Sequence, residues 1–389
     1  MTIRDSSLAT TRGRPRDDES RRRRSVVAPP VVVALVVMLC MAGGAVGLLV
    51  RSADRSSPSP SSSPLGSDGK QPSSAKPIIR GLVTTLEPPA ASVDLPRSFV
   101  VNVSWAELQP TRGGPILDDN AIDKALAVIR GFDRSSTQPP LQVKLRVSSG
   151  IHAPDWAKSV GGPPFTVTES FSSITGAVGR FWTDEFGESY RDLQEKLAVR
   201  YDTVPEIAEV VISRCTMVFA EPFIRGSSNS ETVQTLLTAG YTAEADERCQ
   251  RAQIDAHAVW RQTSSGLALN PYQRLVAGAE PRTDEQFTER MMEYCRERLG
   301  LRCVLENNSI RWPPLGGPYD KIYATMKSLG PPMSFQTAAP SRIGDAVDTI
   351  RWAIRHGANA VEFVAGTKAL PPGAFTELDQ GLRANPESG

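Results

Sequence analysis

Histidine is scarce in this sequence, and closely spaced cysteine pairs and nucleotide-binding turns are absent. Only three His and five Cys occur among 389 residues. The His show no ligand spacing and there is no CxxC pattern, the arrangements that zinc sites favour. Neither GxGxxG nor a P-loop pattern is present, and these are the turns that dinucleotide- and phosphate-binding sheets use. We therefore predict no metal and no cofactor.

Most of the chain also lacks an excess of positive or negative charge. The formal net charge is +1, and residues 1–25 alone hold eight Arg against four acidic residues. The remainder is slightly acidic, which does not suit a nucleic-acid-binding surface. We expect no nucleic acid partner. Segment 1–25 has too little apolar surface to fold alone, so we expect it to be disordered.

A long hydrophobic run occurs once, at 31–50, and contains no charged residue. About 20 apolar residues cross a bilayer as a helix, so the run and its extension back to Val26 predict a transmembrane helix over 26–50. Four arginines, Arg21 to Arg24, precede it. The positive-inside rule then leaves 1–25 in the cytoplasm and the C-terminal part outside, as in a single-pass protein of the cell membrane. A cleaved signal peptide is the alternative, although its apolar core spans about 7–15 residues.

Residues 51–76 are dominated by Ser and Pro. Such a composition behaves as an extended, solvated tether. The folded part is then 77–389, which we expect to be one extracytoplasmic domain. That length is sufficient for a (β/α)8 barrel of about 250 residues.

Four cysteines lie in this domain, where the extracytoplasmic setting permits disulfides. A short-range Cys295–Cys303 bridge would leave Cys215 with Cys249. Four cysteines allow three pairings, and four free thiols remain an equal alternative.

Eight strand candidates alternate with helical patterns in the folded part. The strands are expected at 78–86, 99–105, 141–147, 210–219, 267–275, 302–305, 333–336 and 358–364, and the helices at 121–132, 184–201, 243–262, 284–299, 319–328 and 343–355. Strands that alternate with helices form a parallel sheet. Eight such units favour a closed barrel, with an open doubly wound sheet as the alternative. The predicted fold class is α/β, a single (β/α)8 TIM barrel after one transmembrane helix and a disordered linker.

The stretch 210–225 has the most informative pattern. A short apolar run rich in β-branched residues, typical of a buried parallel strand, stops at Ala220-Glu221-Pro222. In a (β/α)8 barrel, the residues that follow the strands line the active site. A carboxylate at this position is costly to bury without a partner. We therefore predict that Glu221 is a catalytic or sugar-contacting carboxylate.

Other polar and aromatic residues are expected at the same end of the barrel. They are Trp105 after the second strand, Arg146, His152 and Trp156 at and beyond the third, Trp182 at the end of the following loop, Asn308 (with Glu306) after the sixth, Gln336 at the end of the seventh and Glu362 in the eighth. Carboxylates, amides, Arg and Trp together suit a sugar site, because Trp offers a flat apolar face and the polar groups match hydroxyls. In the alternative interpretation the Trp residues pack loops, Glu306 is a solvated or helix-capping acid, and Arg146 forms a structural ion pair with Glu221 or Glu362.

Four segments together carry a family resemblance. WAELQP, KLRVSSGIHAPDWA, GRFWTDEFGESYRDLQEKLAVRYD and AEPF resemble the glycoside hydrolase (β/α)8 barrels of the large retaining clan. The likeness is closest to bacterial β-galactosidase-like and cellulase-like members and covers most of 77–364. It implies that Glu221 matches the acid/base Glu that ends strand four, usually as Asn-Glu-Pro, with Ala220 here in place of the Asn.

The resemblance also implies a nucleophilic Glu at the end of strand seven, where this chain has Gln336. An amide cannot be that nucleophile, so the chain is a divergent relative. Glycoside hydrolysis needs two carboxyl groups, and Glu362 or Glu306 is the expected second one. We therefore predict a membrane-anchored extracytoplasmic glycoside hydrolase-like protein with Glu221 and Glu362 as catalytic residues. The alternative is an inactive barrel that binds cell-envelope or environmental polysaccharide.

Overall fold

The computed structural model describes residues 75–84, 96–133, 141–169, 172–366 and 369–387. The predicted cytoplasmic segment, the predicted transmembrane helix and nearly all of the predicted linker lie outside these ranges. Within them, no helix combines the length and the hydropathy that crossing a bilayer requires.

Eight parallel strands close into a barrel, as the sequence predicted. Around the barrel they follow the order β1-β12-β11-β10-β7-β6-β3-β2, with β2 paired to β1. Their bounds are β1 Gly81–Thr84, β2 Ser98–Ser104, β3 Gln142–Ser148, β6 Ile207–Val211, β7 Ser264–Ala268, β10 Cys303–Ile310, β11 Met333–Thr337 and β12 Ala360–Phe363. Each of the eight expected strands has a counterpart, and the open doubly wound sheet is excluded.

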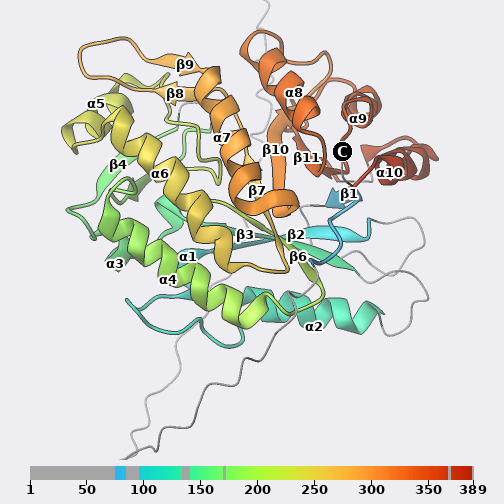
Figure 1. Ribbon diagram of the computed structural model, residues 1–389, viewed down its shortest axis with the longest axis horizontal. Coiled ribbons are helices and arrows are strands. Elements are labelled where there is room, and N and C mark those ends of the chain that lie inside the picture. Colours follow the sequence, from blue (N-terminus) through green and yellow to red (C-terminus); the bar gives the residue numbers. More distant parts are fainter. Residues whose placement is uncertain (1–74, 85–95, 134–140, 170–171, 367–368, 388–389) are drawn as a thin grey trace, which may run out of the picture. The chain divides into compact units, whose positions relative to one another are not determined.

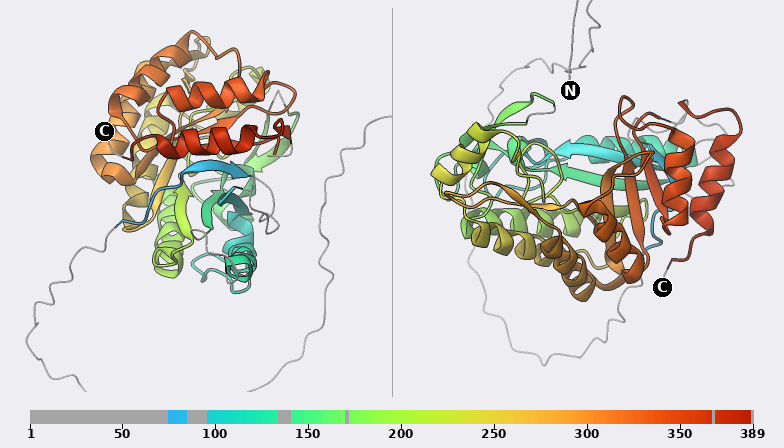
Figure 2. Two further views of the ribbon diagram at one scale, coloured as in Figure 1. Left: turned by 90° about the vertical axis from the view of Figure 1, so that its right-hand side faces the viewer. Right: turned by 90° about the horizontal axis from the view of Figure 1, so that it is seen from above.

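Seven longer helices follow the strands from β2 onward and cover the outside of the barrel. They are α2 Ala121–Asp133, α4 Asp184–Tyr201, α6 Ala243–Ala256, α7 Glu285–Leu299, α8 Pro318–Leu329, α9 Ala346–Arg355 and α10 Ala374–Ala384. Helices α4, α6, α7 and α8 lie side by side in this order, and α9 packs beside α10 (Figures 1 and 2).

Shorter elements lie in the connections between the strands and the longer helices. They are α1 Trp105–Leu108, the 3-10 turn η1 Gly150–His152, α3 Asp155–Lys158, α5 Ser230–Thr238, the 3-10 turns η2 His257–Val259 and η3 Gly300–Arg302, the two-stranded sheet of β4 Phe165–Thr168 with β5 Thr175–Val178, and that of β8 Tyr272–Arg274 with β9 Arg282–Asp284. Most of them belong to the connections after β3, β6 and β7.

Side-chain caps define where several helices begin. The Asn120 side chain accepts from the backbone N–H of Ile122, and Thr183 and Thr242 cap α4 and α6 in the same way. Each cap satisfies an N–H group that has no partner within its helix. Helix α6 ends at Ala256, earlier than the expected 262, because His257 turns inward to bond Tyr190 and Ser265.

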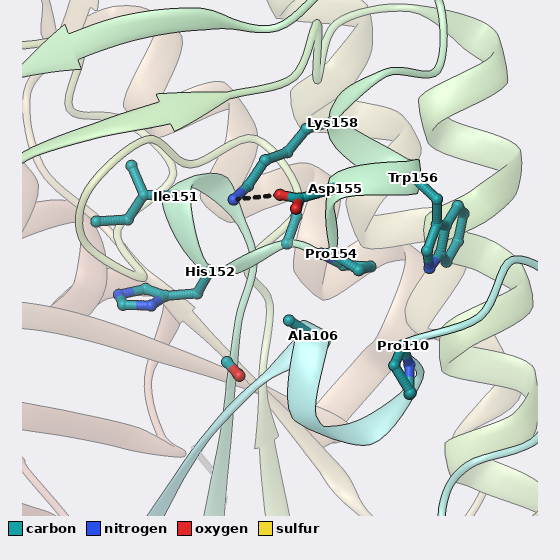
Figure 3. A pocket seen from close by; sticks show the side chains of 10 residues that line it. Ala106, Pro110, Ile151, His152, Pro154, Asp155, Trp156 and Lys158 are labelled. Atoms are coloured by element: carbon teal, nitrogen blue, oxygen red, sulfur yellow. Dashed lines mark ion pairs between the residues drawn. The ribbon is translucent and has the colours of Figure 1, made fainter. Parts of the chain in front are cut away.

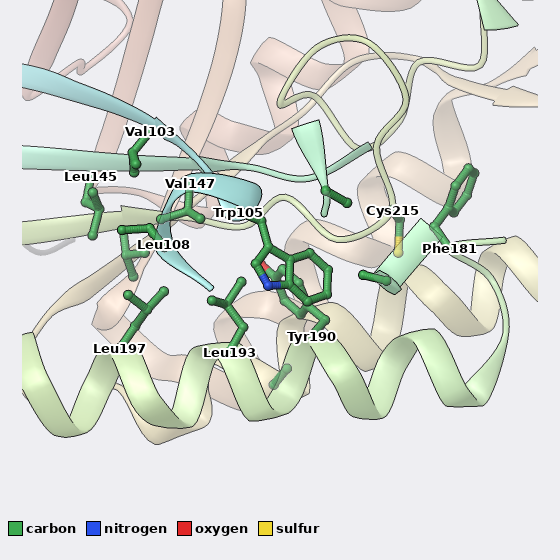
Figure 4. Close-up of a cluster of buried hydrophobic side chains, with 14 of the residues drawn as sticks. Val103, Trp105, Leu108, Leu145, Val147, Phe181, Tyr190, Leu193, Leu197 and Cys215 are labelled. Carbon is green, nitrogen blue, oxygen red and sulfur yellow. The ribbon is translucent and has the colours of Figure 1, made fainter. Parts of the chain in front are cut away.

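The main core lies between the strands and the surrounding helices. Val103, Leu145 and Val147 project from β2 and β3 onto Leu193 and Leu197 of α4 (Figure 4). All five side chains are buried. The 3 to 4 residue spacing on α4 therefore places its apolar face against the sheet.

Two disulfides cross-link the described part of the chain. Cys215 is bonded to Cys249 and Cys295 to Cys303, which is the pairing that the short-range bridge implied. The first joins the connection after β6 to α6, and the second joins α7 to β10.

The interior of the barrel contains buried charge. The Lys144 ammonium lies 2.6 Å from a Glu306 oxygen and 3.1 Å from a Glu209 oxygen, and all three side chains are at most 3% exposed. Gly266 leaves room for them, since a Cβ there would lie 2.0 Å from the Glu306 carboxylate and 3.0 Å from that of Glu209. Burial raises the pKa of Glu306 well above its usual range, with the Glu209 carboxylate adding to the effect.

Gly266→Ala is expected to destabilise the protein by about 1–3 kcal/mol, the usual cost of overpacking a core. The added methyl group would force the Glu306 carboxylate away from Lys144. Gly131→Ala is the control, because it lies in α2 with no atom near its would-be Cβ and should stabilise by about 0.5–1 kcal/mol. The free energy of unfolding in urea measures both, and equal effects of the two changes would contradict the prediction.

Candidate active site

The mouth of the barrel, the end at which the strands finish, carries a layer of polar side chains. Asn102 is the register partner of Arg146, and Gln336 is the register partner of both Asn308 and Glu362. Register partners point to the same face of a sheet, so these groups line the interior at one level. Asn102 is exposed, and Arg146 and Gln336 are partly exposed. Solvent therefore reaches this level.

Glu362 is held on both of its oxygens. Arg146 Nη2 donates to Oε2 at 2.6 Å across the barrel, and Gln336 Nε2 donates to Oε1 at 2.5 Å. The side chain is fully buried. Burial acts to raise the pKa of Glu362, but the Arg146 and Lys144 charges overcome it, so the pKa lies below its usual range. Glu362 is therefore an ionised carboxylate, and the ion pair that the sequence offered as one alternative for Arg146 exists.

Glu221 reaches the mouth from a loop and not from a strand end, which corrects the predicted strand at 210–219. Strand β6 ends at Val211, after which Ile212 still donates to Gly266. Ser213 then turns away from the sheet, because its N–H bonds the Tyr190 hydroxyl and its hydroxyl bonds the Val147 carbonyl. We call residues 212–229 the acid loop.

The environment of Glu221 differs from that of Glu362. Its Oε2 accepts from Asn270 Nδ2 at 2.7 Å, and Asn308 also donates to it. Burial raises the pKa of Glu221, and this outweighs the two amides and the Arg146 charge. Because the side chain is only partly buried, the Glu221 carboxyl remains accessible in the mouth, and its raised pKa makes it the more readily protonated of the two carboxyl groups.

One face of α6 holds the acid loop in place. Asp246 accepts from both Nε and Nη2 of Arg225, at 2.7 and 2.6 Å, and Gln250 donates to the Pro222 carbonyl at 2.8 Å. Cys249 is bonded to Cys215, whose N–H donates to the Gln253 side chain. The helical contacts fall at positions 246, 249, 250 and 253, the spacing of a single helix face.

Asp246 is the centre of this attachment. It is fully buried and also accepts from the hydroxyls of Tyr241 and Tyr272, at 2.6 and 2.9 Å. A buried carboxylate needs partners of this kind. Pro222, which directly follows Glu221, and Arg225 are thus both fixed by α6, which sets the position of the Glu221 carboxyl.

Two of the predicted stacking residues lie in the core instead. Trp105 is fully buried, donates to Gln109 and packs edge-on against Trp156, Phe186 and Tyr190 (Figure 4). Trp182 is 8% exposed and packs among Phe165, Phe181 and Tyr241. Neither offers a face to a ligand, because each indole fills space between the long loops and the barrel.

His152 and Trp156 lie beside the mouth and not within it. Both line a cavity of about 470 Å³ that also includes Ser104 at the end of β2 (Figure 3). Partial burial and the Lys158 charge lower the pKa of His152. The imidazole is therefore neutral at pH 7.

Sequence reasoning missed some mouth residues and misplaced another. Asn270, which bonds Glu221, lies two residues after the end of β7, and Tyr319 donates to it at 3.4 Å. The Asn270-Pro271 pair falls inside the predicted strand 267–275, where a proline is unfavourable, and was the available signal for Asn270, whereas Tyr319 lies on α8 and had none. Glu306 was expected beyond its strand, but β10 continues to Ile310 and Glu306 is sealed inside the barrel. In the described part of the chain no His, Cys, Asp and Glu cluster is arranged to hold a metal ion.

Arg146→Gln is expected to lower the free energy of unfolding by about 3–5 kcal/mol at pH 7, the cost of breaking a buried ion pair. Because the folded pKa of Glu362 is lowered, its stabilisation is present above the unfolded value of about 4.3 and disappears as the pH falls through the folded pKa. The difference between wild type and variant should therefore shrink below about pH 4.

The control is Arg351→Gln, which breaks an exposed pair with Glu377 worth at most about 1 kcal/mol. Urea unfolding from pH 7 to pH 3 measures both variants. A pH-independent deficit in Arg146→Gln would show that Glu362 is not ionised through Arg146.

Comparisons with known proteins give structural likeness only. No family model and no curated protein matches this sequence. The chain is similar to endo-glycoceramidase II from Rhodococcus sp., a glycoside hydrolase, at 14% identity over 80% of this chain and 81% of that one, with a TM-score of 0.44. Morphinone reductase is similar at 19% identity over 75% and 79%, with a TM-score of 0.39. At these identities and TM-scores the likeness carries no argument about family or activity, and the barrel is established by its own strand order.

Proposed function

We propose that this protein is a membrane-anchored, extracytoplasmic, glycoside hydrolase-like barrel whose mouth binds a carbohydrate, with Glu221 as proton donor and Glu362 as its ionised partner. One observation carries the proposal. Two carboxyl groups at the same mouth have pKa values displaced in opposite directions, upward for Glu221 and downward for Glu362. Such divergence assigns the acid and the carboxylate of an acid/base pair.

Glu221 suits the role of the acid. A proton donor to a glycosidic oxygen must be protonated near neutral pH and within reach of substrate. The raised pKa shifts Glu221 toward the first condition, and the partial exposure of the side chain meets the second. The Asn270 and Asn308 amides bond the same carboxyl group, so a bound sugar would meet an acid of fixed orientation.

Glu362 suits electrostatic stabilisation better than direct attack. Its negative charge faces the mouth layer and would favour the positive charge that develops on the sugar ring during cleavage. Attack on the sugar, or activation of water, would first require Gln336 to release Oε1. The amide at position 336, where the resembled clan has its nucleophile, thus covers the partner carboxylate.

A second candidate is a barrel that binds polysaccharide without cleaving it. The full burial of Glu362, with both oxygens engaged, favours this function. Asn102, Arg146, Gln336, Asn308 and Glu221 would then serve only as hydrogen-bonding groups for hydroxyls.

The proposed compartment has support from the cysteines. Both disulfides pair all four cysteines of the described part of the chain, and disulfides persist mainly in oxidising compartments. Together with the uncharged run at 31–50, this supports a position outside the cytoplasm with a transmembrane helix as the membrane anchor.

The direct test is release of reducing sugar by the full-length chain from a panel of polysaccharides and aryl glycosides. Glu221→Gln should lower kcat/KM at least about 100-fold, the usual contribution of general acid catalysis, while carbohydrate affinity changes little. Glu195→Gln, an exposed carboxylate on α4, is the control and should keep full activity.

Activity should span the interval between the two displaced pKa values. It should fall on the acid side as Glu362 becomes protonated and on the alkaline side as Glu221 loses its proton. Carbohydrate binding without sugar release in wild type would establish the second candidate, and the absence of both would overturn the proposal.

A further inference from the structure

We propose that the cavity lined by His152 and Trp156 is a second sugar-binding subsite, which takes an uncharged sugar unit next to the one held in the barrel mouth. The inference rests on the proposed function, because it assigns the extended part of the same ligand. The residues that line the cavity are Ser104, Ala106, Pro110, Ile151, His152, Ala153, Pro154, Asp155, Trp156 and Lys158.

The cavity continues the mouth outward along two strands. Asn102 pairs with Arg146 in the mouth layer, and two residues further Ser104 pairs with Ser148 at the strand ends. Two residues rise about 7 Å along a strand. Because Ser104 lines the cavity, a chain that leaves the mouth over β2 and β3 enters it.

The cavity walls combine apolar and polar surfaces, as a sugar ring needs. Figure 3 shows His152 and Ile151 on one side and Trp156 and Pro110 on the other, with Lys158 and Asp155 at the rim. The His152 imidazole forms no hydrogen bond with any residue that the structure describes, while the lowered pKa keeps it neutral at pH 7. One ring nitrogen then donates and the other accepts, which matches a hydroxyl pair.

The cavity is already formed without a ligand. On one wall, Ile151 N–H donates to the Met217 carbonyl at 2.9 Å, and Gly150, at φ 56°, approaches that carbonyl so closely that a Cβ would lie 1.9 Å from it. On the other wall, Trp156 Nε1 donates to the Gln109 carbonyl at 3.1 Å. A preformed site loses little free energy to ordering when it binds.

Met217 also links this cavity to Glu221, because both belong to the acid loop (212–229). The backbone that carries His152 is therefore positioned by the same loop that carries the proposed acid. This connection fixes the spacing between the subsite and the mouth.

Charge decides the class of sugar. Lys158 Nζ lies 3.5 Å from Asp155 Oδ1, so the two rim charges offset each other, and His152 is neutral. No net positive charge remains for a carboxylate. An uncharged hexose or pentose unit is therefore expected, and a uronic acid is not.

The experiment measures affinity by calorimetry on the full-length chain carrying Glu221→Gln, so that cleavage does not interfere. The probes are cello-, xylo-, manno- and galacto-oligosaccharides of one to four units, with oligogalacturonates as charged probes. Adding His152→Ala should weaken binding of the longer neutral ligands by about tenfold, as expected for one lost hydrogen bond, and so reduce the gain in affinity with chain length.

Ala106→Leu should act in the same way by filling the cavity, and it guards against a folding defect specific to His152→Ala. His356→Ala changes a partly buried histidine at the C-cap of α9; it is the matched control and should keep the full gain in affinity with chain length. If both cavity variants keep the full gain in affinity with chain length, or if oligogalacturonates bind more tightly than neutral chains, the proposed subsite is refuted. Neither result would contradict the proposed sugar site in the mouth. Failure of every neutral probe to bind would overturn the proposed function itself.

Discussion

The register of β3 is the constraint on which the interior of the barrel depends. Lys144 and Arg146 are two residues apart, so they point to the same face, and they supply the cations that contact three buried acidic side chains, Glu209, Glu306 and Glu362. A slip of one residue would turn both cations outward. The carboxylates would then be buried without compensation, which is far more costly than any single lost contact. Charge pairing, and not only apolar packing, thus selects this alignment of strands.

The mouth contains two carboxyl groups that are mounted in different ways. Glu362 belongs to a strand and is fixed by neighbours from the barrel wall, whereas Glu221 is carried by a loop whose position is set from outside the barrel by α6. The first environment favours the ionised form and the second the protonated form. An amide at position 336 completes the arrangement, since it satisfies Glu362 at the place where the resembled clan has a second carboxylate.

The strand and helix order was readable from the sequence because eight apolar runs recur along the chain and six helical patterns separate most of them. The eight strands and the position of Gln336 beside Glu362 followed from that pattern. Glu221 lies at the mouth as expected, but a loop carries it and not a strand. The apolar residues after Val211 belong to this loop, in which the Ser213 N–H bonds the Tyr190 hydroxyl and the Ser213 hydroxyl bonds the Val147 carbonyl. The role of Trp105 was also wrong, because sequence does not tell whether an aromatic after a strand turns into the cleft or under the helices. Glu306 looked solvated since its strand was expected to end earlier. Asp246 and Gln250, which hold the acid loop, lie far from it in the chain and could not be inferred.

The attachment of the acid loop to α6 has a consequence for local unfolding. Four positions on one face of α6 contact the acid loop, and one of these contacts is the Cys215–Cys249 disulfide. Among the described residues, only the Ile212 N–H of this loop continues the pairing with β7. The loop should therefore open together with α6 as one cooperative unit and remain independent of the strand that precedes it. In amide hydrogen exchange, the protection of the acid loop would follow that of α6, so the position of Glu221 depends on the stability of an outer helix and not on that of the barrel wall.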